Sequence, residues 1–140
     1  MLFQRLIYTS DAVSDFHEED LSQILDVSRR NNAICGVTGL LVYAEGHFLQ
    51  LLEGRKTDVD DRYARIVTDN RHQNCKIVHR QSAPSRCFPK WEMGFKSDVS
   101  IDRIDHLAHE LQSSVELDHH VSRKPQVVRK FIHAFGELNL

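Results

Sequence analysis

The chain has 140 residues, of which 41% are hydrophobic and 27% charged. That length predicts one domain with a substantial core, and the composition excludes a disordered or membrane-embedded protein. The net charge is -2, from 18 basic and 20 acidic residues spread along the sequence. Because no basic stripe is present, we expect no nucleic-acid partner.

The cysteines and the first residues indicate where the protein works. Cys35, Cys75 and Cys87 are odd in number and form no CxxC pair, as is typical of reduced thiols in a cytoplasm. The apolar start, MLFQRLIYTSDA, is too short for a signal sequence, and no run of 18 apolar residues follows. We therefore expect a cytoplasmic protein that does not contact a membrane.

The first third of the chain predicts a strand and then a helix. Residues 2–10, LFQRLIYTS, are strand formers that alternate between two faces. A helix is expected from Ser14 or Asp15 to about Asn32, because its apolar residues have helical spacing and its first turn is acidic.

The next segments complete a sheet. A hairpin is expected over residues 36–52, with strands at 36–44 and 47–52, and a helix at 57–68. Strands at 75–81 and 91–96 follow. The order βαββαββ, with two helices on one face of a largely antiparallel sheet, predicts an α+β fold of the ferredoxin-like type.

Residues 98–140 differ in pattern from the preceding part. Apolar residues recur at helical spacing over 101–115 and again over 127–138, with Pro125 near the start of the second repeat. We expect two additional C-terminal helices that cover the other face of the sheet. The chain is thus predicted to consist of a unit at 1–97 and a helical extension at 98–140 packed on it.

Polar side chains occupy apolar positions in this predicted fold. In GHFLQLLEG, residues 46–54, Gln50 alternates with Phe48 and Leu52, and Tyr8 faces the same way on the neighbouring strand. The apolar stripe of the first helix continues into Ser28, Asn31 and Asn32. Taken singly, each residue also fits ordinary packing or a solvated helix end. Together they suit a flat heteroaromatic ligand with carbonyls and ring nitrogens.

The segment DNRH, residues 69–72, follows the second helix and adds an arginine and a histidine. A guanidinium pairs bidentately with phosphate, so a nucleotide tail is one interpretation of Arg71, and a solvated turn is the other.

These segments together resemble the BLUF family of blue-light sensors that use flavin. The matching segments are RLIYTS at 5–10, SRRNN at 28–32, GVTGLL at 36–41, FLQLLEG at 48–54, RIVTDNRH at 65–72 and RCFPKWEMGF at 86–95. They stand in unbroken order over residues 2–97. The resemblance implies a bound flavin, usually FAD with FMN as an alternative, whose ring lies between the two helices over the sheet.

The resemblance also implies a role for each matching residue. Asn32 corresponds to the asparagine that binds the pyrimidine edge of the ring, Gln50 to the glutamine beside the ring, and Tyr8 to the tyrosine bonded to that glutamine. Trp91 and Met93 correspond to the pair that competes for the place near the glutamine during signalling. The remaining expected flavin contacts are Ser28 and Asn31 near the ring and Asp69, Arg71 and His72 near the phosphate and outer nucleotide.

For the mechanism, the resemblance implies a light-driven electron transfer from Tyr8 with its proton passing through Gln50. Gln50 then ends rotated or tautomerised, and both alternatives stay open. The signal is expected to leave through the final strand and the C-terminal helices to a separate effector protein. No effector domain follows in the sequence, so a short, stand-alone sensor without enzymatic activity is expected, and spare apolar surface predicts a homo-oligomer.

Three other functions compete with the sensor. An acylphosphatase-like hydrolase would use Arg71 and Asn32 but needs a phosphate-cradling loop, and a flavin oxidoreductase is not supported by any GxGxxG motif. A metal site would draw on the late histidines, His106, His109, His119 and His120. Nine histidines scattered through a small protein are typical of a solvated surface, so no metal is expected.

Overall fold

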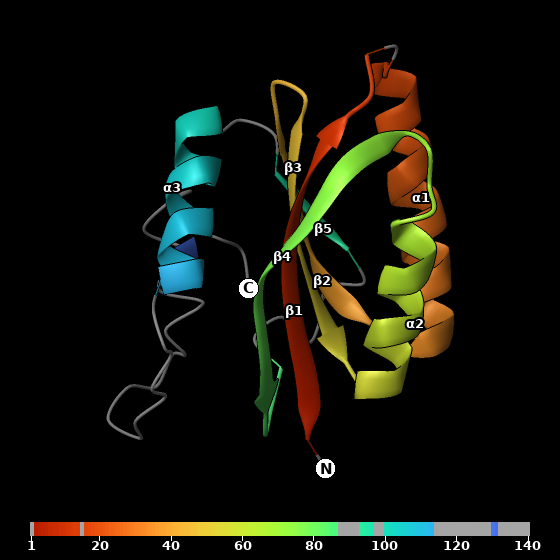
Figure 1. Cartoon of the computed structure of the whole chain (residues 1–140). Helices are drawn as coiled ribbons and strands as arrows, with labels where there is room; N and C mark the ends of the chain where they lie inside the picture. The colour runs from red at the N-terminus through yellow and green to blue at the C-terminus, as the bar shows by residue number, and fades with distance from the viewer. Residues whose placement is uncertain (1, 15, 87–92, 97–99, 114–129, 132–140) are drawn as a thin grey trace.

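The computed structural model describes residues 2–14, 16–86, 93–96, 100–113 and 130–131. Its elements, in order, are β1 (Phe3–Ala12), α1 (Glu18–Cys35), β2 (Thr38–Ala44), β3 (His47–Gly54), α2 (Lys56–Ile66), β4 (His72–Ala83), β5 (Gly94–Lys96) and α3 (Ile101–Ser113). Figure 1 shows the sheet between α1 and α2 on one side and α3 on the other. The predicted α+β order βαββαββ is confirmed.

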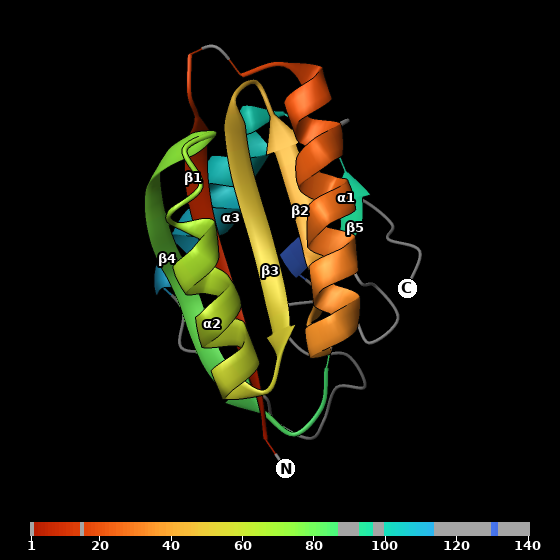
Figure 2. The same ribbon diagram turned by 90° about the vertical axis from the view of Figure 1, so that its right-hand side faces the viewer.

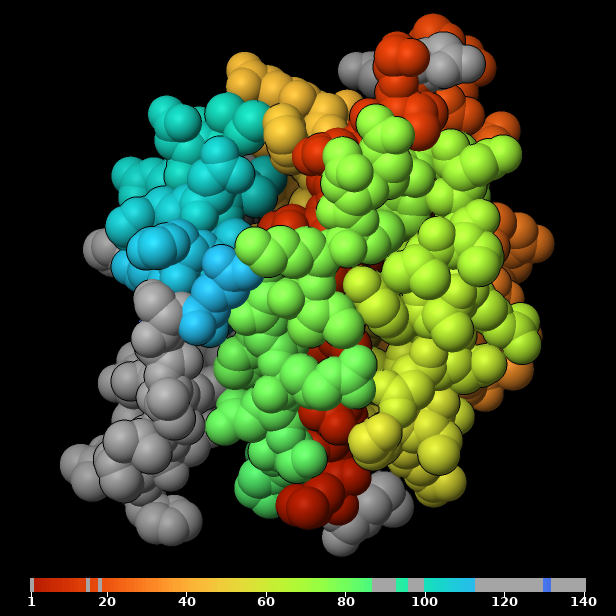
Figure 3. All heavy atoms as spheres, viewed as in Figure 1, coloured from red at the N-terminus to blue at the C-terminus, as the bar shows by residue number. Residues whose placement is uncertain are grey.

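The five-stranded sheet has the order β4-β1-β3-β2-β5. Every neighbouring pair is antiparallel except β2 and β5, which are parallel. The crossover through α1 places β3 between β1 and β2, and the one through α2 places β1 between β3 and β4. The edge strand β4 forms the surface between α3 and α2 in Figure 3. Strands distant in sequence, β1 and β3, are therefore neighbours at the centre.

The two faces of the sheet carry separate apolar clusters. The face under α1 and α2 includes Leu6, Tyr8, Leu41, Phe48, Leu52 and Met93. The opposite face includes Ile7, Leu40, Leu49, Leu51, Ile104, Leu107, Leu111 and Phe131. Alternate residues of β1 and β3 thus point to opposite sides, as the sequence pattern predicts. Both faces are buried, which requires a helical layer on each.

Helix α1 begins and ends about three residues later than expected. It begins at Glu18, after the backbone N–H of His17 donates to the Asp20 carboxylate at 2.9 Å. It ends at Cys35 because Gly36 adopts a left-handed conformation with φ of 73°. A glycine in this conformation is a common helix stop, since a Cβ would be strained there. The extra turn keeps Asn31 and Asn32 inside the helix.

Only one of the two expected C-terminal helices is seen among the described residues, which contain three helices in all. Helix α3 packs on the face formed by β4, β3 and β2, as predicted. The second helix, expected at 127–138, falls outside the described residues except for Lys130 and Phe131, which are helical. Phe131 is fully buried in the same cluster as α3. Within the described ranges, no helix is both long and apolar enough to cross a bilayer.

A buried ion pair fixes the pairing of the central strands. Arg5 on β1 and Glu53 on β3 are each 1% exposed, and Arg5 Nε lies 3.2 Å from Glu53 Oε2. Arg5 Nη1 also donates to Gln81 Oε1 of β4 at 3.1 Å. Because a buried charge without its partner is strongly destabilising, a shift of register is disfavoured. This register sets Tyr8 directly opposite Gln50.

Candidate functional site

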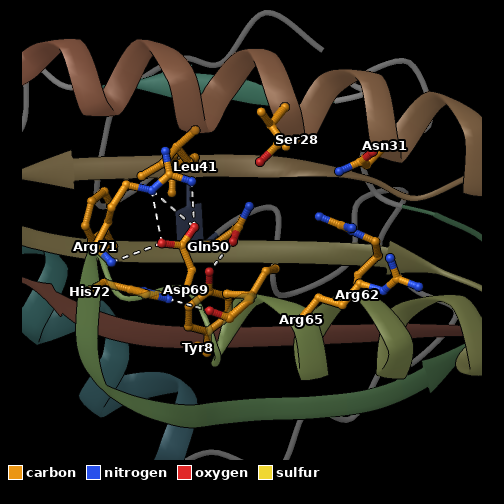
Figure 4. Close-up of a pocket in the computed structure, with 14 residues that line it drawn as sticks. Tyr8, Ser28, Asn31, Leu41, Gln50, Arg62, Arg65, Asp69, Arg71 and His72 are labelled. Carbon is orange, nitrogen blue, oxygen red and sulfur yellow. Dashed lines mark hydrogen bonds and ion pairs between the residues drawn. The ribbon is translucent and has the colours of Figure 1, made fainter.

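A cavity of about 230 Å³ opens between α1 and α2, over the β1 and β3 face of the sheet. Figure 4 shows its polar side chains converging from both helices, both strands and the turn after α2. Its lining residues are Tyr8, Ile24, Val27, Ser28, Asn31, Leu41, Phe48, Gln50, Arg62, Arg65, Ile66, Asp69, Arg71 and His72. Apolar walls with a few oriented polar groups are typical of a small-molecule site.

At the base of the cavity, three buried side chains form a chain of hydrogen bonds. The Tyr8 hydroxyl donates to Gln50 Oε1, and Gln50 Nε2 donates to Met93 Sδ at 3.3 Å. The bond between Tyr8 and Gln50 is confirmed. A thioether is a weak acceptor, so the amide is held firmly at its oxygen and loosely at its nitrogen. Gln50 can therefore exchange its partner at the nitrogen for a stronger acceptor.

The hydroxyl of Tyr8 is a proton donor throughout the neutral range. Burial raises the pKa of Tyr8 well above its usual value, with smaller contributions in the same direction from Cys75, Tyr63 and Asp69 and an opposing one from Arg62. The Tyr8 ring also meets Tyr63 edge-on, with centroids 5.2 Å apart. The neutral phenol is thus fixed both in charge state and in orientation.

His72 is oriented by two neighbours within the chain. Its Nε2 lies 2.7 Å from the carbonyl oxygen of Ile66, and its Nδ1 lies 2.9 Å from Ser10 Oγ. A carbonyl only accepts, so Nε2 carries a proton and donates to Ile66, while Nδ1 contacts the Ser10 hydroxyl, which can donate or accept. Both ring nitrogens are thus used within the chain.

Arg71 and Asp69 form a bidentate ion pair at the same end of the cavity. Arg71 Nη2 lies 2.6 Å from Asp69 Oδ2, and Arg71 Nε lies 3.0 Å from Asp69 Oδ1. The hydrogen bonds from Arg71 lower the pKa of the Asp69 carboxyl. The two charges neutralise each other, so this end presents little net charge.

The opposite end of the cavity is cationic. Figure 4 shows Arg62 and Arg65 of α2 near Asn31 of α1. Arg65 pairs with the exposed Asp61 at 3.3 Å, whereas the buried Nε of Arg62 has no hydrogen-bond partner within the part of the chain that is described. A buried donor without a partner is unfavourable, so this nitrogen fits a ligand oxygen. An anionic or carbonyl-bearing ligand would satisfy it.

The structure brings most of the predicted site residues together. The cavity lining includes the expected Tyr8, Ser28, Asn31, Gln50, Asp69, Arg71 and His72. Asn32 is 1% exposed and is not part of the lining, although its neighbour Asn31 is. Met93 accepts a hydrogen bond from Gln50, and Trp91 lies outside the described residues. The roles of these residues toward a ligand stay predictions.

Sequence reasoning missed Arg62 and Arg65. The signal that would have found them is their spacing with Asp69, since positions i, i+3 and i+7 share one face of a helix and its continuation. The pattern Val59, Tyr63, Ile66 predicts only the apolar face of α2. A cation beside an apolar stripe is usually a solvated residue, so sequence alone gives it little weight.

Among the described residues, no group of three or more His, Cys, Asp or Glu side chains is placed to hold a metal ion. His106 pairs with Glu110 on α3 at 3.0 Å. His119 and His120 fall outside the described residues.

Comparison with known proteins identifies a family for most of the chain. A family model described as sensors of blue light using FAD, named BLUF, matches residues 3–94. The chain is a member of the BLUF family. The resemblance inferred from the sequence motifs is thereby confirmed, and a BLUF domain implies a flavin. The cavity fits that group, because it offers apolar walls for a flat ring and, from Arg62, a buried N–H for a ligand oxygen.

Relatives of this BLUF chain differ in length and output. It is 36% identical to photoactivated adenylate cyclase subunit beta of Euglena longa over 63% of this chain and 10% of that protein. It is 35% identical to the blue light- and temperature-regulated antirepressor BluF of Escherichia coli K12 over 61% of this chain and 21% of that one. The chain thus spans only a small part of both.

Among solved structures, the dark state of the BLUF protein BlrB is similar over nearly the full length of both chains. The TM-score is 0.70 at 28% sequence identity, covering 96% of this chain and 95% of that one.

Proposed function

We propose that this BLUF chain is a blue-light photoreceptor that binds FAD without a covalent bond in the cavity between α1 and α2. The observation that carries the proposal is the hydrogen-bonded chain of Tyr8, Gln50 and Met93 at the base of that cavity. A phenol, an amide and a thioether form a neutral, reversible relay. Such a relay can exchange its hydrogen bonds without consuming a substrate, which favours sensing over catalysis.

A bound flavin would supply absorption of blue light and an electron acceptor beside Tyr8. Tyr8 then acts as the electron and proton donor, since its hydroxyl already donates to Gln50 Oε1. Gln50 would accept this proton at its oxygen and pass one from Nε2, which Met93 Sδ binds only weakly, to the flavin that took the electron. Recombination leaves the amide rotated or tautomerised, and both outcomes agree with the geometry.

The cavity residues divide the work of holding the cofactor. Ser28 and Asn31 line the cavity and are proposed contacts of the ring, and Gln50 is proposed at its edge. Asn32 is also a proposed ring contact, although it is buried beside the cavity lining and not part of it. The resemblance assigns Asp69, Arg71 and His72 to the outer nucleotide, but they lie at the other end of the cavity from Arg62 and each already has a partner within the chain. Arg62, whose buried Nε lacks a partner among the described residues, is the cation that best fits a phosphate oxygen.

We further propose that the signal leaves through Met93 and β5 to a separate effector protein in the cytoplasm. Support comes from the position of Met93, which contacts Gln50 and directly precedes β5. A regulatory relative, the Escherichia coli antirepressor, is consistent with output through a partner protein. We propose that Trp91 and the C-terminal helices take part in the same signalling route. We also propose that the protein forms a homo-oligomer.

The test is an absorption spectrum of the purified protein in the dark and under blue light. The unsubstituted protein should be yellow and its flavin absorption should shift to the red on illumination. Tyr8→Phe should keep the flavin and lose the shift, because the electron and proton donor is gone. Gln50→Leu should also lose the shift, because the relay is interrupted.

Tyr43→Phe is the matched control, since Tyr43 is a half-buried tyrosine of β2 that does not line the cavity. It should keep both the flavin and the shift. A colourless protein would contradict flavin binding, and a normal shift in Tyr8→Phe would contradict the role of Tyr8.

A further inference from the structure

Met93 is held at two points by two different elements. Its side-chain Sδ accepts from Gln50 Nε2 at 3.3 Å, and its backbone carbonyl accepts from Arg29 Nε at 3.1 Å. The next residue, Gly94, begins β5 and pairs with Leu40 of β2. Met93 therefore links Gln50 at the base of the cavity to the edge strand β5. The hydrogen bond from Arg29 links Met93 to α1.

Arg29 lies at the edge of the α1 face that packs on the sheet. It is one turn after the buried Leu25 and three residues before the buried Asn32, so the three share one helix face. Figure 2 shows α1 running beside β2 and β5. The guanidinium reaches past the helix edge to the carbonyl of Met93, and the side chain stays largely exposed.

The position of Met93 decides whether the Gln50 amide has a partner at its nitrogen. A thioether attracts an N–H only weakly, so this bond does not by itself keep Met93 in place. If Met93 moved away, the buried Nε2 of Gln50 would lose the acceptor that it has among the described residues, which is unfavourable. A stronger, charge-assisted bond to the Met93 backbone provides the restraint that the sulfur does not.

We infer that Arg29 is a positioning residue, which holds Met93 against Gln50 and so sets how fast the switched network returns to its dark arrangement. The inference rests on the proposed function, because it needs a light-switched Gln50. When Arg29 restrains the backbone, the returning amide finds Sδ in place. Without that restraint, the amide and Met93 must both be reordered before the dark bonds form again.

The first test measures thermal recovery of the light-induced absorption shift in the flavin-loaded full chain. Arg29→Ala should slow recovery about fivefold, the change expected for losing one partly exposed hydrogen bond of ordinary net strength. Arg29→Lys, which keeps a charged donor, should recover within about twofold of the unsubstituted rate. Arg30→Ala is the matched control, because Arg30 is exposed and has no hydrogen bond or ion pair within the described residues.

A double substitution separates positioning from a general effect on α1. Met93→Leu removes the sulfur acceptor, so adding Arg29→Ala to it should change recovery by less than about twofold. Recovery in Arg29→Ala that is unchanged or faster would overturn the inference. An equal slowing by Arg30→Ala, or the full fivefold slowing in the Met93→Leu background, would also overturn it.

A measurement without light keeps the inference separate from the proposed function. The chain has two methionines, so a sample labelled at the methionine methyl carbons gives two NMR signals, and Met93→Leu identifies that of Met93. Arg29→Ala should shift or broaden the Met93 signal, while Arg30→Ala should leave it unchanged. An unchanged Met93 signal in Arg29→Ala overturns the inference. A protein that shows no light-induced absorption shift overturns the proposed function, and the NMR signal then still tests whether Arg29 positions Met93.

Discussion

The polar residues of the cavity differ chiefly in whether they already have a partner. Tyr8 and Gln50 satisfy each other, and Arg71 is paired with Asp69. Arg62 is different, since its buried Nε has no partner among the described residues. Residues with internal partners keep their geometry when the cavity is empty, whereas an unpartnered arginine N–H gains a hydrogen bond only when a ligand enters. Ligand affinity is therefore expected to depend strongly on Arg62.

We predict that Arg62→Gln weakens binding of FAD and FMN by roughly tenfold, because a charge-assisted bond to phosphate is lost. Riboflavin, which has no phosphate, should bind the substituted and unsubstituted proteins about equally. Fluorescence titration of the flavin-free protein with the three flavins measures these affinities.

Arg55→Gln serves as the control, since Arg55 precedes α2, is exposed and lies outside the cavity lining. It should leave all three affinities unchanged. Equal weakening of riboflavin by Arg62→Gln would place Arg62 against the ring instead of a phosphate.

Among the elements, the central strands position the switch. Tyr8 of β1 lies opposite Gln50 of β3, and Gln50 lies opposite Leu41 of β2. Residues directly opposite each other in antiparallel strands have Cβ atoms about 5 Å apart, so the phenol reaches the amide without any loop motion. The pairing of β2 with β3 is unusually close at Gly39, where an added Cβ would lie 1.9 Å from the backbone oxygen of Leu51.

We predict that Gly39→Ala lowers the free energy of unfolding by about 2–3 kcal/mol, because β2 must move away from β3 to admit the methyl group. Denaturation by urea, followed by circular dichroism, measures this change. Since the strands that carry Gln50 and Leu41 are adjacent to the site, the flavin absorption maximum should also move.

The control is Gly46→Asn in the hairpin turn. Gly46 has φ of 83°, an added Cβ there would meet no atom within 4 Å, and asparagine tolerates this conformation better than most residues. Its effect should stay below about 1 kcal/mol. Unchanged stability in Gly39→Ala would show that the strands separate freely at this point.

For the whole molecule, the sheet separates two layers with different tasks. The cavity lies between the sheet and the helices α1 and α2, and the layer with α3 closes the opposite face (Figure 1). Leu107 of α3 is fully buried in that second layer. Removing apolar contacts there should lower stability without altering the surroundings of the flavin.

We predict that Leu107→Ala lowers the free energy of unfolding by about 3 kcal/mol, through lost transfer energy and the cavity left behind. The flavin absorption spectrum of the folded protein should be unchanged in the dark. Arg103→Ala, at an exposed position of the same helix, should change stability by less than about 0.5 kcal/mol. A shifted dark spectrum in Leu107→Ala would indicate that α3 acts on the cavity through the sheet.

The sequence by itself determined the order of the elements and the two faces of β1 and β3. These depend on local periodicity and on short connections, which alternation of side chains makes readable. The motifs also determined the BLUF family, because their order and spacing are specific even where each segment is weak. Through that resemblance they indicated the bond between Tyr8 and Gln50.

Only the tertiary structure decided which polar groups are already satisfied. Three findings depend on how side chains are placed in space. Arg71 is paired with Asp69, and Arg62 Nε has no partner among the described residues. Arg29 donates to the carbonyl of Met93. Residues 29 and 93 meet only because β5 joins the sheet beside β2, under α1. A hydrogen bond requires both partners within about 3 Å, and for residues distant in sequence that distance is fixed by packing, which no local pattern contains.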